Sequence, residues 1–164
     1  MSLLMGSVGH VDISGHGQTD RESEMYAIEK THWGLRLTFG GLMNQEEMSR
    51  WLEDTRKVLT NQEDEFYVFV DMRTLIPLDK DAQIPMQEGQ KLCHQKGMIR
   101  SVVILSSPVT AAQFRRIGGE TGIGKFERYI DASSMPDWEE AGLNWLFNEV
   151  DPDSIIRTTT AASD

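Results

Sequence analysis

Residues Gly119 to Lys125, "GETGIGK", have the Gly-x-x-x-x-Gly-Lys spacing of a loop that cradles nucleotide phosphates. In such a loop a Ser or Thr follows the lysine and ligates magnesium, but Phe126 stands there in this chain. A phosphate loop also leaves a strand and opens a helix, so that free backbone N–H groups face the anion. Here the glycines follow a helical pattern and lead into a strand pattern. We therefore interpret the stretch as a turn that ends a helix.

Polar side chains that follow two strongly apolar runs form a second candidate site. Asp71 follows "FYVFV", and Ser106 and Ser107 follow "SVVIL". Open α/β sheets bind ligands at the carboxyl ends of their parallel strands, and we include Arg73 in this candidate site. Asp71 is also a candidate phosphoryl acceptor, although the first strand lacks the acidic pair that would hold magnesium. The simpler alternative is that Asp71 caps the following loop and that the two serines begin a helix at Pro108.

Histidine and cysteine give little support for catalysis or metal binding. His10 and His16 form a pair without a third ligand, and His32 and His94 do not follow a strand. The single cysteine, Cys93, excludes an internal disulfide and any thiolate metal cluster. The chain contains no Gly-x-Ser-x-Gly motif. We expect no enzyme activity, no metal and no cofactor.

The pattern of apolar residues predicts the elements that position these side chains. Residues 25–30 and 32–40 alternate apolar and polar side chains, which predicts an antiparallel hairpin. Asn44 and Glu47 predict a capping box at the start of a helix. Two nearly continuous apolar runs predict buried central strands. These runs are 65–72 and 99–107; helical patterns cover 81–97, 108–122 and 133–150, and 126–132 predicts a short edge strand.

This order of elements, ββαβαβαβα, predicts a single α/β domain. We expect a four- to five-stranded mixed, mainly parallel sheet with an N-terminal β-hairpin and about four helices on its two faces. The helix at 81–97 is the weakest of these because it contains Pro85. We place the domain at residues 25–150, a flexible Gly/Ser-rich arm at 1–24 and a tail at 151–164.

Charge and hydropathy narrow the expected partners. The 164 residues include 16 basic and 26 acidic side chains, which gives a formal net charge of −10. A surface that tracks phosphates needs clustered Lys and Arg, so we expect no nucleic acid partner. No apolar run approaches the roughly 18 residues of a membrane span, and the N-terminus lacks the pattern of a secretion signal. We expect a cytoplasmic protein with no integral membrane segment.

The order of elements, together with "FYVFVDMRTLIPLDKDA", "IRSVVILSSPVTAAQFRRI" and "WEEAGLNWL", resembles the STAS superfamily. Its namesakes are the tails of sulfate transporters and the anti-sigma factor antagonists. The similarity is to the SpoIIAA-like bacterial branch, whose fold is related to that of lipid-carrying Sec14 domains, and it extends over roughly residues 25 to 150. The resemblance implies a SpoIIAA-like fold and a regulatory domain that binds another protein.

The resemblance also implies where such a partner would bind. In the antagonists an Asp-Ser-Ser/Thr-Gly turn opens a helix and presents the serine that a partner kinase phosphorylates. This turn aligns with Asp79, Lys80, Asp81 and Ala82. Asp81 stands in place of the phosphorylated serine, and its carboxylate carries about one charge where a phosphate carries nearly two. Asp81 therefore either imitates a phosphorylated state or marks a domain without the switch, and we favour the second interpretation.

Three functions follow as expectations. The first is a non-enzymatic regulatory or protein-interaction domain of STAS type that binds a protein partner or a second copy of the chain. The alternative is a carrier of a lipid or another apolar small molecule, of the Sec14 kind, in which the apolar segment 72–86 lines a pocket. The simpler interpretation of this segment is that it completes the core or a dimer interface. A phosphotransfer protein acting through Asp71 is the third. The apolar residues of the segment are Met72, Leu75, Ile76, Leu78, Ile84 and Met86.

Overall fold

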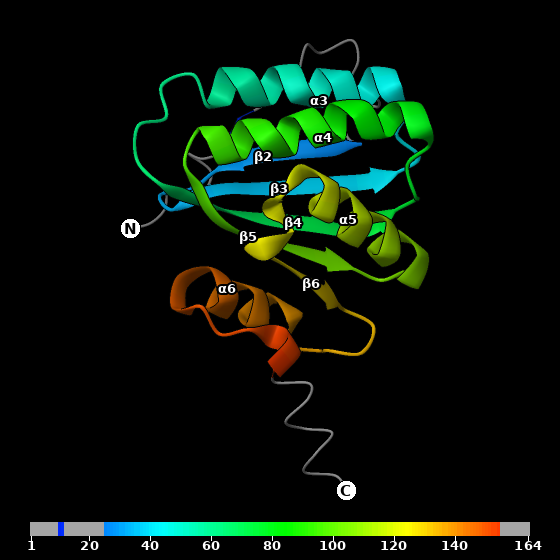
Figure 1. Ribbon diagram of the computed structural model, residues 1–164, viewed down its shortest axis with the longest axis vertical. Coiled ribbons are helices and arrows are strands. Elements are labelled where there is room, and N and C mark those ends of the chain that lie inside the picture. The colour runs from blue at the N-terminus through cyan, green and yellow to red at the C-terminus, as the bar shows by residue number, and fades with distance from the viewer. Residues whose placement is uncertain (1–9, 12–24, 155–164) are drawn as a thin grey trace, which may run out of the picture.

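The computed structural model describes residues 10–11 and 25–154, which form one sheet with helices on both faces (Figure 1). The strands are β1 (His10–Val11), β2 (Tyr26–Lys30), β3 (Gly34–Gly41), β4 (Phe66–Leu75), β5 (Met98–Leu105) and β6 (Glu127–Asp131). The helices are α3 (Gln45–Val58), α4 (Lys80–Gln95), α5 (Pro108–Thr121), the 3-10 turn η1 (Ile123–Lys125) and α6 (Trp138–Asn148). The strands lie side by side in chain order, with β1, β2 and β3 antiparallel and β3 to β6 parallel.

The predicted fold class is confirmed. Strands β2 to β6 and helices α3 to α6 follow the order ββαβαβαβα in a mixed, mainly parallel sheet. The two-residue strand β1 adds a sixth strand within the segment predicted to be a flexible arm; the rest of that arm lies outside the described residues. Only 151–154 of the predicted tail are described, and they include a short helical turn in which Pro152 is buried.

The direction in which the sheet grows explains why the helices are unevenly divided between its faces. Each parallel strand from β3 to β6 is added on the same side of the previous one. Crossovers between parallel strands are right-handed in nearly all proteins, so successive crossovers in one direction place their helices on one face. Helices α3, α4 and α5 share the larger core on that face, and α6, which follows the last strand, covers the other face with a smaller core.

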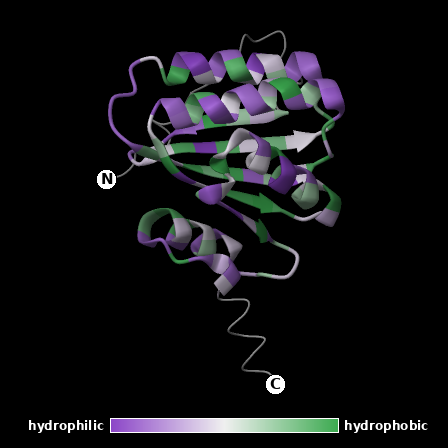
Figure 2. Cartoon of the chain, in the orientation of Figure 1, coloured by the Kyte–Doolittle hydropathy of each residue, from purple (hydrophilic) through white to green (hydrophobic). Residues whose placement is uncertain are grey.

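Alternation along β4 supplies both cores. Phe66, Val68 and Val70 belong to the larger core, whereas Phe69 points to the opposite face and packs in the smaller core under α6. The strand is buried on both sides, which is why its sequence reads as a continuous apolar run. Figure 2 shows hydrophobic residues concentrated on the strands, with hydrophilic residues on the outer sides of α3 and α4.

The helix ends carry the signals that the sequence predicts. The Asn44 side chain accepts a hydrogen bond from the Glu47 backbone at 2.9 Å, and the Glu47 side chain accepts one from the Asn44 backbone at 2.8 Å. This reciprocal capping box fixes the start of α3. Helix α5 ends at Gly122, whose φ of 92° is left-handed, and Gly97 has a φ of 113° just after α4. Helix α4 runs through Pro85 without a break.

Strand β4 is longer than predicted, and this changes the position of Asp71. The strand continues to Leu75, so Asp71 lies within it, opposite Thr38 of β3 and Ile104 of β5. A register shift between Thr38 and Gly40 lets β3 follow β4 beyond this point, and the Ile76 backbone N–H still donates to the Gly41 carbonyl at 3.0 Å. The expectation that Asp71 marks the strand end is wrong.

Candidate functional site

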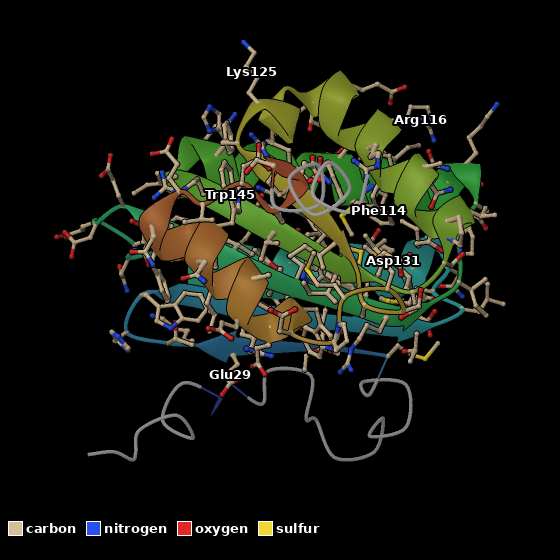
Figure 3. All side chains as sticks on the ribbon, turned by 90° about the horizontal axis from the view of Figure 1, so that it is seen from below. Glu29, Phe114, Arg116, Lys125, Asp131 and Trp145 are labelled. Atoms are coloured by element: carbon tan, nitrogen blue, oxygen red, sulfur yellow. The ribbon has the colours of Figure 1, made fainter. Side chains whose placement is uncertain are left out.

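The motif at Gly119 to Lys125 contains the last residues of α5 and the turn that leads to β6, so it ends a helix as the sequence predicts. Gly122 ends α5 in a left-handed conformation, and η1 then leads into β6. The carboxyl end of α5 faces this turn, so the negative end of the helix dipole would repel an anion there. Lys125 is exposed and projects away from the protein (Figure 3). The segment therefore lacks the geometry of a phosphate-binding loop.

Asp71 and Arg73 form a closed pair on the α6 side of the sheet. Asp71 Oδ1 accepts from the Arg73 backbone N–H and from Nε, each at 3.0 Å, and Oδ2 accepts from Nη2 at 2.9 Å. Burial alone would raise the pKa of Asp71, but the hydrogen bonds and charge of Arg73 outweigh it, so the pKa is lowered. The guanidinium also lies 4.2 Å from the ring centroid of Trp138. The pair thus links β4 to the start of α6.

Phosphotransfer chemistry is not expected at Asp71, because Arg73 already binds both carboxylate oxygens. The described residues also hold no group of three His, Cys, Asp or Glu side chains placed for a metal ion. Beryllium fluoride with magnesium should therefore leave the amide resonances around Asp71 unchanged in ¹⁵N–¹H spectra, with a receiver domain as the positive control. Shifts centred on Asp71 that the D71N variant abolishes would establish phosphotransfer after all.

The remaining predicted polar residues lie at a different place, where α4 and α5 begin. Asp79 caps α4 by accepting from the Ala82 backbone N–H at 2.8 Å, and Ser107 caps α5 by accepting from the Thr110 backbone N–H at 3.3 Å. The neighbouring side chains of Lys80, Asp81 and Ser106 are exposed. The predicted site therefore divides into two parts: a closed pair on the α6 face and a group of helix starts at the carboxyl edge of the sheet.

Exposed apolar side chains gather at this same edge, toward which the parallel strands point in Figure 1. They are Leu42 (64% exposed), Ile76 (49%), Ile84 (48%) and Val109 (66%), and we call them the carboxyl-edge surface. The hydrogen bond from the Ile76 N–H to the Gly41 carbonyl places Ile76 beside Leu42, the residue that follows Gly41. The Thr110 hydroxyl donates to the Leu75 carbonyl at 3.4 Å, which holds the start of α5 beside Ile76. Ile84 lies on the exposed side of α4, five residues after its cap.

The sequence reasoning missed Leu42 and Val109. Each stands one residue beyond an element boundary: Leu42 follows β3, and Val109 is the second residue of α5. At such positions the alternation of the preceding strand no longer applies and the helix has not yet packed on the sheet. A large apolar residue there is a signal that could have been used.

The apolar segment 72–86 divides between core and surface. Met72, Leu75, Leu78 and Met86 are buried in the larger core, and only Ile76 and Ile84 are exposed. Gln113 of α5 holds the middle of the segment, since its side chain accepts from the Leu78 backbone N–H and donates to the Leu78 carbonyl, both at 2.8 Å. The segment is therefore fixed against α5, and most of it completes the core.

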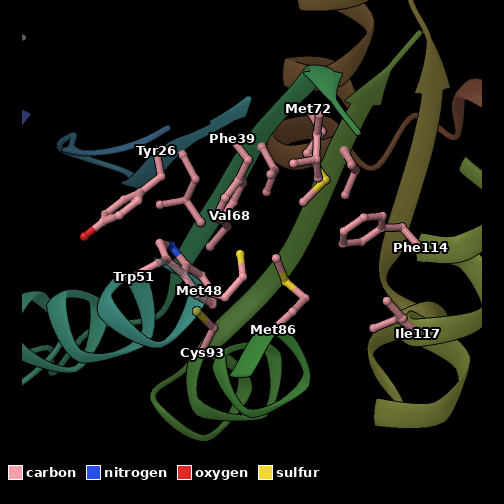
Figure 4. Close-up of a cluster of buried hydrophobic side chains, with 14 of the residues drawn as sticks. Tyr26, Phe39, Met48, Trp51, Val68, Met72, Met86, Cys93, Phe114 and Ile117 are labelled. Atoms are coloured by element: carbon pink, nitrogen blue, oxygen red, sulfur yellow. The ribbon is translucent and has the colours of Figure 1, made fainter. Parts of the chain in front are cut away.

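A small cavity lies inside the larger core. Its volume is about 30 Å³, and all sixteen residues that line it are buried, including Met72 and Met86. Figure 4 shows Met72, Met86 and Phe114 facing one another here, with Trp51 and Cys93 nearby. Trp51 also lines the cavity, and its buried Nε1–H has no hydrogen-bond partner within the described residues. This space suits a water molecule rather than a lipid chain, so the observed cavity does not favour the carrier alternative.

The Cys93 thiol is a core side chain and is poorly suited to react. It is buried, and burial, followed by the charge of nearby Glu127, raises its pKa to about 12. The side chains of His10 and His16 lie outside what the structure describes. Over the described ranges, no helix combines the length and apolar character needed to cross a membrane.

Comparison with protein-family models, with curated proteins and with solved structures finds no match to this chain.

Proposed function

We propose that this protein is a non-enzymatic interaction domain of STAS type, which binds a protein partner through the carboxyl-edge surface. The observation that carries the proposal is the concentration of Leu42, Ile76, Ile84 and Val109 at one edge. Among the described residues, the other large apolar side chains of comparable exposure are Phe147 and Val150, near the end of α6. Single exposed apolar residues are ordinary, but a group of them on neighbouring segments is typical of a binding surface.

The surroundings of this surface favour a protein as the occupant. Lys80, Asp81 and Ser106 are exposed next to it and supply a polar rim of both charge signs. Protein interfaces commonly have this composition, with apolar residues at the centre and hydrogen-bonding groups at the margin. The resemblance to anti-sigma factor antagonists suggests a serine kinase of the anti-sigma type as the partner.

Binding should not depend on phosphorylation. Asp81 occupies the second position of α4, where a fixed negative charge interacts favourably with the helix dipole. It has no hydroxyl to phosphorylate, and the next residue, Ala82, is buried. We infer that the surface is permanently competent to bind, and that any control of binding resides in the partner.

Titration calorimetry with the anti-sigma-type kinases encoded in the same genome tests the proposal. We expect the V109D variant to weaken binding at least about tenfold, because it places a charge in the contact at a cost of about 1.4 kcal/mol or more. The fold should tolerate this change, since aspartate is favourable in the first turn of a helix. V150D is the matched control, because Val150 is an exposed valine that follows α6, outside the carboxyl-edge surface. No complex at tens of micromolar, or equal losses in both variants, would count against the proposal.

A further inference from the structure

Glu127 is a carboxyl group inside the larger core, on a face of β6 that meets α5. Only 4% of the residue is exposed. Its Oε1 lies 2.6 Å from the Tyr129 hydroxyl oxygen, and its Oε2 lies 2.7 Å from the Ser101 hydroxyl oxygen. No Lys, Arg or His among the described residues forms an ion pair with it. A charge buried without a counter-ion is costly, whereas a neutral acid with two hydrogen bonds is not.

The hydrogen atoms around Glu127 fit together when the carboxyl group is protonated. The Tyr129 hydroxyl oxygen also lies 3.1 Å from the Phe114 carbonyl oxygen, which can only accept. Tyrosine has one hydroxyl hydrogen. If that hydrogen is donated to Phe114, the short contact between Tyr129 and Glu127 requires a hydrogen from the acid. Ser101 then donates to the other carboxyl oxygen, and every group in the chain of contacts is satisfied.

Among the described residues, no Lys, Arg or His contributes through its charge to the pKa of Glu127, and the basic groups on the elements around it are directed elsewhere. From α4, the neutral Cys93 thiol is close enough for the charge of Glu127 to raise its pKa. From α5, Arg115 lies 5.0 Å from the ring centroid of Tyr129. On β6, the Arg128 guanidinium lies over the Trp145 ring on the other face of the sheet. Beside η1, His94 stacks on Phe126 with 5.0 Å between ring centroids, and Lys125 is exposed.

Gly118 makes room for the cluster, which gives a physical reason for one glycine of the "GGETG" stretch. A Cβ atom at Gly118 would lie 2.3 Å from the Tyr129 hydroxyl oxygen and 3.3 Å from Glu127 Oε1. The same position brings the carbonyl-rich end of α5 toward the carboxyl group, and that end of a helix disfavours negative charge. Glu127 also lines the small cavity, where a water molecule fits beside it.

Ionisation of Glu127 would disturb this arrangement. When the proton leaves to solvent, the carboxylate needs the Tyr129 hydrogen, and the Phe114 carbonyl then loses it. Burial raises the pKa of Glu127 to about 7, and the hydrogen bonds with Tyr129 and Ser101 offset only part of the shift. Because the folded pKa lies above the unfolded value of about 4.5, the proton stabilises the fold fully below that lower value. This stabilisation is lost as the pH rises to about 7, and it remains lost above.

We propose that Glu127 is a buried proton-binding site, and that losing its proton loosens the corner formed by the end of α5, η1 and β6. This proposal does not depend on the proposed function, because it concerns a different part of the protein. Residues Gly118 to Asp131 form the corner. The protonation of Glu127 makes the stability of this corner respond to pH near neutrality.

Denaturant unfolding of the full chain at pH 5 and pH 8 tests the proposal with the E127Q variant, whose amide can make the same hydrogen bonds as the neutral acid. The unfolding equilibrium constant of the unsubstituted protein should rise on the order of 100-fold between the two pH values. In E127Q we expect a change of less than about threefold. The exposed-site variant E63Q should behave like the unsubstituted protein. Histidines change charge in the same range, so the comparison is repeated in an H94Q background.

A direct measurement remains decisive if E127Q fails to fold. In ¹³C NMR of the unsubstituted protein, the side-chain carboxyl carbon of Glu127 should titrate near neutral pH, well apart from the exposed glutamates. Hydrogen exchange, corrected for its intrinsic pH dependence, should accelerate in residues 118–131 and not in α3. A Glu127 midpoint in the ordinary acid range, or equal pH dependence in E127Q and the unsubstituted protein, would overturn the proposal.

Discussion

Replacing Trp145 with alanine is expected to lower the free energy of unfolding by about 4 kcal/mol. Trp145 is buried at the centre of the smaller core, and its indole N–H donates to the Ser101 carbonyl at 2.9 Å. The Arg128 guanidinium lies 4.1 Å from the ring centroid. Truncation would leave a cavity, remove the hydrogen bond to the Ser101 carbonyl and uncover the Arg128 guanidinium. Because α6 is the helix that covers this face, the loss would loosen the whole helix.

Urea unfolding followed by circular dichroism measures the effect. The matched control is Trp138→Ala on the same helix, since Trp138 is only half-buried and the Arg73 guanidinium lies over its ring. We expect that control to cost about 1 kcal/mol. If both substitutions had the same small effect, α6 would not be anchored to the sheet through Trp145.

Replacing Gly34 with alanine should also cost about 4 kcal/mol or more, for a different reason. Gly34 has a φ of 152°, and a Cβ atom there would meet the Tyr67 carbonyl oxygen at 1.9 Å and its nitrogen at 2.8 Å. These are backbone atoms of the central strand β4, which cannot move aside. The Tyr67 N–H also donates to the Trp33 carbonyl at 3.0 Å, so the clash would break the pairing where β3 meets β4.

Thermal and urea unfolding of Gly34→Ala should be compared with Gly122→Ala. Gly122 also has a positive φ, 92°, but a Cβ atom there would meet nothing within 4 Å. The control thus has the conformational cost of a positive φ, about 1 kcal/mol, but not the clash. A domain of this size has roughly 5–15 kcal/mol of stability, so the Gly34 variant should be severely weakened. Equal effects would mean that the backbone conformation, and not the close approach, dominates.

Local signals in the sequence predicted most of the fold correctly. The hairpin, the two buried strands and the capping box at Asn44 depend on neighbouring residues, and the pattern of side chains reports such features directly. The turn at Gly122 was predictable for the same reason, because a helix pattern ends there in glycine. The interpretation of "GETGIGK" as a turn rested on this order of elements.

Features that depend on distant segments were not predictable in the same way. The extension of β4 to Leu75 requires the register shift between Thr38 and Gly40 in β3. The sequence of β4 itself contains no pattern that indicates this shift. The error placed Asp71 at the carboxyl edge, although it lies within the strand and pairs with Arg73. The cluster of Glu127, Ser101 and Tyr129 joins β5 to β6. It could not be predicted either, because Ser101 is far from the other two residues in the sequence.

The candidate site was predicted in part. The start of α4 at Asp79 and the start of α5 at Ser107 do lie at the carboxyl edge, because a helix that follows a parallel strand begins near the carboxyl end of that strand. The apolar residues that surround them were assigned to one segment, 72–86, whereas the exposed ones also come from two other parts of the chain: the loop after β3, with Leu42, and α5, with Val109. Surfaces of this kind are assembled by the fold, so spacing in the sequence cannot identify them.

The central claim is that a protein partner binds at the carboxyl-edge surface. A ¹⁵N–¹H titration of the full chain with an anti-sigma-type kinase, the partner proposed above, tests this claim most directly. We expect the largest shifts at Leu42, Ile76, Ile84 and Val109, with none at Glu29 or Phe147 on the far parts of the molecule. Shifts centred on α6, or a bound complex that leaves the carboxyl edge unperturbed, would contradict the account.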